Sequence, residues 1–156
     1  MISKILYVAV LGSAMVAAAA TQQPSFAGRW TFDPGQSREV GMMSAMKIHT
    51  LVTQNANELI VDDISDFNGQ TDTQHIVYDL EGKSVPNHPI MGGTAMTRSH
   101  WESSRLVTEW ESPGSIAGTA VKRTEVRYLS ADGSTMFIES SRSNQKPMVM
   151  VFTRDR

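Results

Sequence analysis

Two neighbouring segments decide the fold class: Thr94–Trp101, which reads T-A-M-T-R-S-H-W, and Arg105–Glu111, which reads R-L-V-T-E-W-E. In each, apolar or small hydroxyl side chains alternate with charged or polar ones. That alternation is typical of a strand that buries one face. Because the connection between the two segments is short, they predict an antiparallel hairpin.

Segments of the same kind recur beyond Ser25, where no long helical periodicity is found. Turn sequences separate several of them, such as Asn68-Gly69 and Asp132-Gly133. A series of hairpins of this length favours a closed sheet, because closure removes exposed edges. We therefore predict an all-β protein, an up-and-down antiparallel β-barrel of about 8–10 strands. The candidate strands are Gly28–Phe32, Ala45–Gln54, Glu58–Ile64, Thr73–Leu80, Thr94–Trp101, Arg105–Glu111, Ala120–Leu129, Thr135–Ser140 and Pro147–Arg154.

Two segments interrupt this pattern. Ser37–Ser44 contains Met42 and Met43, and it predicts a short helix or flap. Val85–Gly93 has two prolines and two glycines and includes Met91, and it predicts a long connection. In a barrel, longer connections of this kind surround one mouth, where function is commonly located.

Residues 1–20 have the features of a cleaved signal peptide. Lys4 supplies a positive charge, Ile5–Val16 is apolar, and Ala18 and Ala20 form an A-x-A cleavage site. The apolar stretch is shorter than the roughly 20 residues that span a bilayer. We therefore expect a periplasmic or secreted protein, with residues 21–156 forming a single domain and no membrane span after cleavage.

Composition excludes several classes of protein. A net charge of −2 offers no general attraction to nucleic acid or anionic lipid. A hydrophobic fraction of 40% is typical of a chain that folds. The absence of cysteine excludes disulfides, a thiolate nucleophile and a cysteine-based metal site. We expect no cofactor, and the oligomeric state is left open.

The segment Phe26-Ala27-Gly28-Arg29-Trp30 contains G-x-W and resembles the start of lipocalin-like, calycin-type barrels. The chain as a whole is similar to the small secreted lipocalin-like domains of bacteria. This resemblance implies structural roles for Gly28, for Trp30 as a plug at the closed end, and for Arg154 packed across that tryptophan. The segments that support it are 78–83, Trp101 with Leu106-Val107, 129–136 and 151–154.

The predicted inner faces are mostly apolar with small hydroxyls, as in many small-molecule sites. Methionine is common on adaptable binding surfaces. We expect Met43 and His88 at the rim of the barrel. The alternative is a packed barrel in which the methionines only fill the core. The candidate ligand-binding residues are Met43, Ile48, His88, Trp101, Thr108, Trp110, Arg127, Met136 and Met150.

Residues 120–129 leave two registers open. Apolarity favours Val126 and Tyr128 inside and leaves Arg127 solvated, whereas the family pattern turns Arg127 inward. The two exclude each other, because a shift by one residue reverses every side chain of a strand. An inward Arg127 needs a partner, such as a ligand carboxylate or Glu109.

No catalytic motif is found, and no catalytic residue is predicted. The four histidines lack the spacing of metal ligands, so no metal site is predicted. Asp62 and Asp63 are adjacent on a strand and therefore point to opposite faces, which makes them a poor acid–base pair. An enzyme would have to draw its ionisable groups from Arg127, Glu109, His75 and Tyr128.

These observations favour an exported barrel that binds a small, mainly hydrophobic ligand in its interior. One alternative is a cell-envelope interaction or scaffold module with a packed barrel. The other is a barrel enzyme of the isomerase, cyclase or lyase type, which rests on analogy between folds alone.

Overall fold

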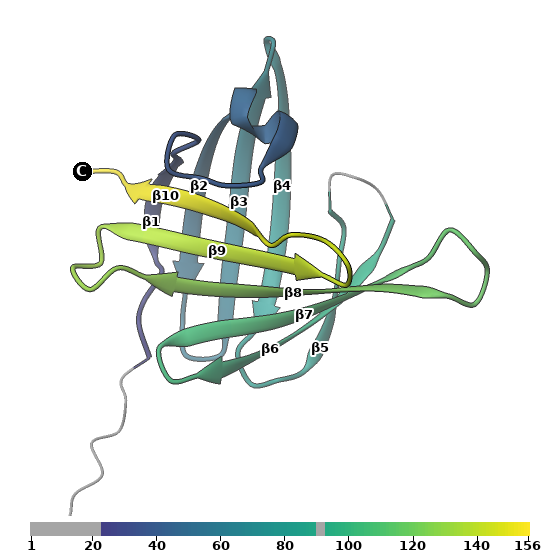
Figure 1. Ribbon diagram of the computed structural model, residues 1–156. Helices are drawn as coiled ribbons and strands as arrows, with labels where there is room; N and C mark the ends of the chain where they lie inside the picture. Colours follow the sequence, from purple (N-terminus) through teal and green to yellow (C-terminus); the bar gives the residue numbers. More distant parts are fainter. Residues whose placement is uncertain (1–22, 90–92) are drawn as a thin grey trace, which may run out of the picture.

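The computed structural model describes residues 23–89 and 93–156, which form ten antiparallel strands and one short 3₁₀ helix (Figure 1). Each strand pairs with its neighbour in the chain except β4 with β5, and β10 pairs with β1. The predicted up-and-down β-barrel is therefore confirmed. The elements are β1 Gly28–Phe32, η1 Gly41–Ala45, β2 Lys47–Gln54, β3 Glu58–Phe67, β4 Gln70–Asp79, β5 Ser84–Asn87, β6 Ala95–Glu102, β7 Arg105–Pro113, β8 Ala120–Leu129, β9 Thr135–Arg142 and β10 Met148–Arg154.

All the predicted strands are present, with ends shifted by up to three residues, but one further strand, β5, was not predicted. It includes Val85–Asn87, the start of the segment Val85–Gly93 that was expected to be a long connection, and over those residues the expectation was wrong. Its Pro86 lowers strand propensity, yet proline is tolerated at the edge of a sheet. β5 is the last strand of the sheet and pairs only with β6. Met91 lies outside the described residues.

The side chain of Asn87 connects β5 to β4 by hydrogen bonds. The Asn87 Oδ1 accepts a hydrogen bond of 2.9 Å from the Val77 N–H, and its Nδ2 donates one of 2.8 Å to the Val77 carbonyl. The same Nδ2 is 2.8 Å from the Thr97 hydroxyl on β6. The Asn87 amide thus takes the place of a peptide group where the two end strands of the sheet meet, and it makes the barrel nearly closed.

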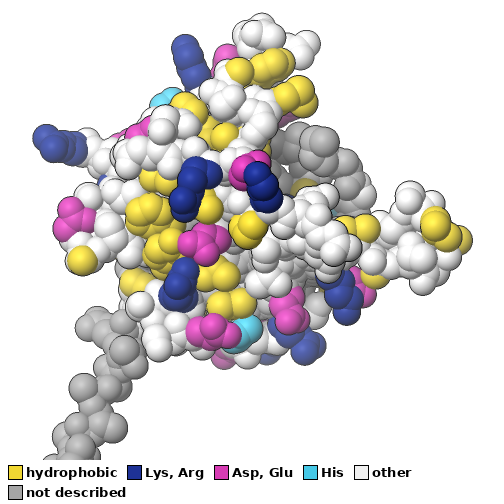
Figure 2. Space-filling view, viewed as in Figure 1, with side chains coloured by type: hydrophobic (Ala, Val, Ile, Leu, Met, Phe, Trp, Pro, Cys, Tyr) yellow, Lys and Arg dark blue, Asp and Glu magenta, His cyan; other side chains and the backbone are white. Residues whose placement is uncertain are grey.

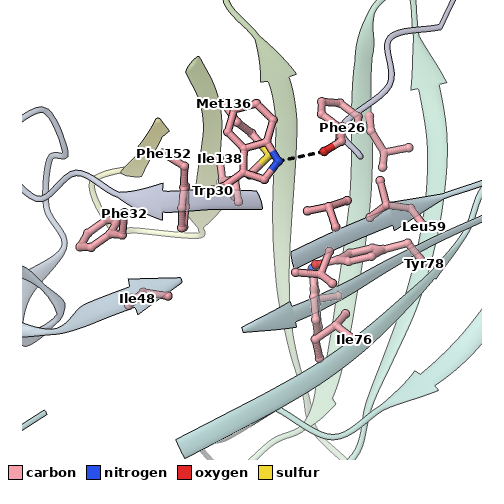
Figure 3. Close-up of a cluster of buried hydrophobic side chains, with 14 of the residues drawn as sticks. Phe26, Trp30, Phe32, Ile48, Leu59, Ile76, Tyr78, Met136, Ile138 and Phe152 are labelled. Atoms are coloured by element: carbon pink, nitrogen blue, oxygen red, sulfur yellow. Dashed lines mark hydrogen bonds between the residues drawn. The ribbon is translucent and has the colours of Figure 1, made fainter. Parts of the chain in front are cut away.

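The plugged end of the barrel is filled by aromatic side chains. We use this name for the end that holds the β2–β3, β4–β5, β6–β7 and β8–β9 turns. Trp30 is fully buried and donates a 2.9 Å hydrogen bond to the Phe26 carbonyl. Phe26 stacks on Trp101, with ring centroids 5.8 Å apart. Figure 3 shows Phe26 and Leu59 on one side of Trp30, with Phe32 on the other.

Arg154, on the last strand β10, packs against Trp30 at the plugged end. The guanidinium carbon of Arg154 is 4.1 Å from the centre of the Trp30 ring. Its Nη1 donates to the Ala27 carbonyl at 2.8 Å and its Nε to the Gly133 carbonyl at 3.0 Å. Gly28 has a φ of +138°, and a Cβ there would lie 2.6 Å from the Arg154 Nη1. The close approach of Arg154 therefore requires glycine at position 28.

The segment between β1 and β2 lies at the opposite end of the barrel. It contains η1, which confirms the short helix predicted over residues 37–44, displaced toward β2. Met43 is partly buried and packs against the core, whereas Met42 is 82% exposed. In Figure 1, η1 lies toward the same end as the β3–β4 turn. No helix in the described ranges has the length and apolarity needed to cross a membrane.

Candidate functional site

The inner face of β8 carries Arg123, Glu125 and Arg127. The residues Glu125 and Arg127 are almost fully buried, at 7% and 3% exposure. The interpretation of residues 120–129 that left Arg127 solvated was therefore wrong, and the family-pattern register is the one observed. Glu109 is exposed on the outer wall and is not the partner of Arg127.

Packing on the outer wall explains why Tyr128 faces outward, although its apolar character favoured an inward position. Tyr128 stacks on Phe137 of β9 with ring centroids 5.0 Å apart, and Arg105 lies 4.1 Å above the Tyr128 ring. The Tyr128 hydroxyl donates a 2.5 Å hydrogen bond to Glu139. Tyr128 is thus covered by neighbours on the outside of the barrel. Figure 2 shows hydrophobic side chains on this face interspersed with charged ones.

Arg127 connects opposite sides of the barrel. Its Nη2 donates to the Tyr78 hydroxyl oxygen of β4 at 3.2 Å and to the Glu125 Oε1 at 3.2 Å. The Tyr78 hydroxyl donates in turn to the same Glu125 oxygen, also at 3.2 Å. The Arg127 Nη1 is 3.8 Å from the Met136 sulfur. An arginine, a carboxylate and a phenol thus form one hydrogen-bonded group inside the barrel.

A second carboxylate, Asp63 on β3, lies close enough to this group to affect its charges. It accepts a hydrogen bond from the buried Thr50 hydroxyl of β2. Burial raises the pKa of Asp63 above its ordinary value, although the Thr50 hydrogen bond and the charge of Arg127 oppose this. Asp62 faces outward, 2.6 Å from His75, so the two aspartates do point to opposite faces as predicted.

Burial and neighbouring charges also shift the pKa values of Tyr78 and Arg127. Burial and the negative charge of Glu125 raise the pKa of Tyr78, which keeps its phenol protonated. Burial favours a lower pKa for Arg127, but the phenol of Tyr78 and the carboxylates of Glu125 and Asp63 outweigh it and raise that pKa. Arg127 therefore keeps its positive charge although it is buried, because the neighbouring groups compensate for the loss of hydration.

Around this group the interior is lined by Trp110 and by short hydroxyl side chains. Trp110 meets the Tyr78 ring edge to face at 6.0 Å, and the guanidinium of Arg123 lies 4.2 Å over the Trp110 ring. The Ser99 and Thr108 hydroxyls are 2.9 Å apart. The buried residues of this kind are Thr50, Ser65, Thr97, Ser99, Thr108 and Ser140.

The structure places most of the predicted ligand residues inside the barrel or against its core, and their roles stay predictions. Arg127 belongs to the polar group, Trp110 contacts the Tyr78 ring, and the Met136 sulfur contacts Arg127. His88 is exposed, with its Nδ1 3.3 Å from the Thr94 hydroxyl. The candidates that are buried or packed against the core are Met43, Ile48, Trp101, Thr108, Trp110, Arg127, Met136 and Met150.

Of the four residues considered for an enzyme, only Arg127 lies inside. Glu109, His75 and Tyr128 are on the outer wall. Tyr78, Glu125 and Asp63 were not among the predicted site residues. Strand alternation could have found two of them, because Glu125 shares the face of Arg127, and Asp63 follows the buried Leu59 and Val61 at intervals of two.

Two hollows are found on the outside of the barrel. One, of about 430 Å³, lies between Pro24, Ser104 and the β8–β9 turn at Leu129–Gly133. The other, of about 330 Å³, lies on the outer wall of β6 and β7 around Met96 and Glu109. In the part of the chain that the structure describes, no three His, Asp or Glu side chains gather closely enough to hold a metal ion.

Known structures resemble this one in fold. Human cRBP IV superposes with a TM-score of 0.63 at 15% identity, covering 85% of this chain and 99% of that one. A structure described as REP1-NXSQ fatty acid transporter has a TM-score of 0.63 at 14% identity, with coverage of 83% and 96%. Lipid binding protein 8 of Caenorhabditis elegans has a TM-score of 0.64 at 10% identity, with coverage of 83% and 95%.

These likenesses define the class of fold, the lipocalin-like or calycin barrel. At such low identity they concern the fold alone. No protein-family model and no curated protein matches the sequence.

Proposed function

We propose that this chain is an exported bacterial protein, periplasmic or secreted, that binds a small, mainly hydrophobic ligand inside its barrel without transforming it. One observation carries the proposal: short hydroxyl side chains occupy inward positions of a ten-stranded barrel. Side chains just fill a barrel of about eight strands. We expect a wider barrel with short Ser and Thr side chains inside to leave space for a guest.

Two further features support the proposal. The interior combines an apolar plug with a few buried polar groups, which is the usual make-up of a small-molecule site. The names of two similar structures, a fatty acid transporter and a lipid binding protein, describe proteins that handle apolar molecules in this fold. Export rests on the signal peptide expected at residues 1–20, which lie outside the described part.

The proposal is tested by native mass spectrometry of the protein purified gently from bacterial periplasm, followed by solvent extraction. Ser140→Phe puts a large side chain into the interior beside Glu125, its partner across the β8–β9 pair. Ser141→Phe makes the same change on the exposed outer face and is the matched control. We expect a reproducible added mass in the wild type and in S141F, and its loss in S140F.

A protein that carries no added mass, and that no member of a lipid and metabolite panel stabilises against heat, would contradict the proposal. That result would favour the packed scaffold.

One observation favours a second candidate, a barrel enzyme. Asp63, with its raised pKa, lies in the field of Arg127 and Glu125, so a carboxylic acid able to exchange a proton sits near a fixed cation. The test is to incubate the extracted molecule with the wild type and with Asp63→Asn. A change in that molecule's mass or chromatographic mobility in the wild type alone would favour the enzyme.

A further inference from the structure

The two most exposed large hydrophobic side chains of the described residues lie at one end of the barrel. We call it the distal end; it is opposite the plugged end and holds the β3–β4, β7–β8 and β9–β10 turns. Met42, in η1, is 82% exposed, and Ile116, in the β7–β8 turn, is 70% exposed. Single exposed apolar residues are ordinary, whereas a gathering of them marks an interaction site. Of the seven exposed large hydrophobic residues, six lie in turns or strand halves toward the distal end: Met42, Ile64, Phe67, Met96, Ile116 and Val121.

Met42 and Ile116 each lie within an uncharged segment, and we call these two segments the tips. Residues 40–46 read V-G-M-M-S-A-M, and residues 112–121 read S-P-G-S-I-A-G-T-A-V. Figure 2 shows the β7–β8 hairpin projecting from the barrel, with hydrophobic atoms near its end and no charged side chain there. No charge has to leave water when these tips enter an apolar medium, which avoids the largest cost of such a transfer.

Hydrogen bonds within each tip satisfy polar groups close to the exposed side chain. The Ile116 carbonyl accepts from the Thr119 N–H at 3.1 Å and from the Thr119 hydroxyl at 2.7 Å. The Gly114 N–H donates to the Thr119 carbonyl at 2.8 Å. In η1, the Ser44 hydroxyl donates to the Gly41 carbonyl at 2.8 Å. These bonds lower the cost of removing both tips from water.

The charges that border the tips are balanced. Glu111 and Lys122 flank the β7–β8 tip, with the Lys122 Nζ 3.2 Å from the Glu111 Oε2. Glu39 precedes the η1 tip, and its Oε1 lies 3.7 Å from the Nζ of Lys146 in the β9–β10 turn. A border of this kind is complementary to a headgroup layer that carries equal numbers of positive and negative charges.

We propose that the distal end docks on a zwitterionic lipid surface, with Met42 and Ile116 entering the boundary between headgroups and acyl chains. This inference goes beyond the proposed ligand binding and does not depend on it. The two tips project from separate elements (Figure 1), whereas a protein partner usually buries one continuous patch rich in aromatic residues and arginine. A bilayer accommodates separate tips. Asp66 and Asp72 of the β3–β4 hairpin, at the same end, disfavour an anionic surface.

The test is co-sedimentation of the protein with vesicles of phosphatidylcholine. Two aliphatic side chains give weak, reversible binding, so we expect about half of the wild type on the vesicles at about 10 mM lipid. Ile116→Asp and Met42→Asp should each lower the bound fraction about tenfold, because each places a charge where an apolar side chain enters the lipid. Raising the salt from about 0.1 M to about 1 M should change the binding less than about twofold, since the bordering charges are balanced.

Leu51→Asp is the matched control. Leu51 is 41% exposed on the wall of β2, away from the distal end, so L51D should bind like the wild type. All three substituted residues are exposed, so the variants should keep the wild-type midpoint of urea denaturation.

A wild type that stays in solution at this lipid concentration would overturn the proposal, and so would I116D and M42D proteins that bind as well as L51D. Binding to phosphatidylglycerol vesicles alone, abolished by salt, would show an electrostatic contact instead. A wild-type dimer that Ile116→Asp dissociates, with no binding to vesicles, would show that a second copy of the chain covers the tip and would equally overturn the proposal.

Discussion

Replacing Asn87 by alanine should open the contact between β4 and β5. The substitution removes three hydrogen bonds of 2.8–2.9 Å and leaves the N–H and carbonyl of Val77 without their partner. A buried hydrogen bond contributes about 1 kcal/mol net, and an abandoned buried group costs about 1–3 kcal/mol. Because water can reach part of the gap opened between β4 and β5, we expect a loss of about 2–4 kcal/mol in the free energy of unfolding.

Urea denaturation measures this loss, and hydrogen exchange of the Val77 amide locates it. That amide should exchange much faster in N87A, while the amides of β8 and β9 change only by the global loss. Asn87→Asp keeps an acceptor for the Val77 N–H but turns an oxygen toward the Val77 carbonyl, so it should be similarly destabilising. Asn57→Ala, in an exposed turn, is the control. An N87A protein as stable as N57A would refute the role assigned to this amide.

Two other predictions concern the plug and the buried acid. Gly28→Ala should lower the free energy of unfolding by about 1–3 kcal/mol, because alanine rarely adopts a φ of +138° and its Cβ would displace Arg154 from Trp30. An unchanged midpoint of urea denaturation would contradict this prediction. Burial raises the pKa of Asp63 in the folded state, so the wild type should lose stability as the pH rises from the ordinary pKa of an aspartate, about 4, through the folded value. Asp63→Asn lacks that loss, and its advantage over the wild type in urea midpoint should grow with pH; an advantage that shrinks as the pH rises would count against a raised pKa.

Most of the barrel could be predicted because strand alternation and turn residues are local signals. Asn68 and Gly69 have φ values of 53° and 79°, which is the backbone that an Asn-Gly hairpin turn requires. β5 could not be found in the same way. It is short, it contains Pro86, and it is held to β4 by the side chain of Asn87, for which no local pattern exists.

The interior polar group was harder to predict, because it depends on which face of each strand turns inward and on contacts across the barrel. On β8, Val126 and Tyr128 form the more apolar face, yet Tyr128 is covered from outside by Phe137 and Arg105. Arg127 instead turns inward, where Tyr78 reaches it from β4. The two residues are 49 positions apart, and nothing local to either segment indicates the other.

The pairing of β1 with β10 has a consequence for how the protein is made. The Ala27 carbonyl accepts its hydrogen bond from Arg154, 127 residues later in the chain, and Trp30 lies opposite Arg154 in the β1–β10 pair. The barrel therefore cannot close until its last strand has emerged from the ribosome, and contacts of such long range form slowly. For a chain exported as we propose, this late closure leaves time for the polypeptide to be threaded across a membrane before the barrel forms.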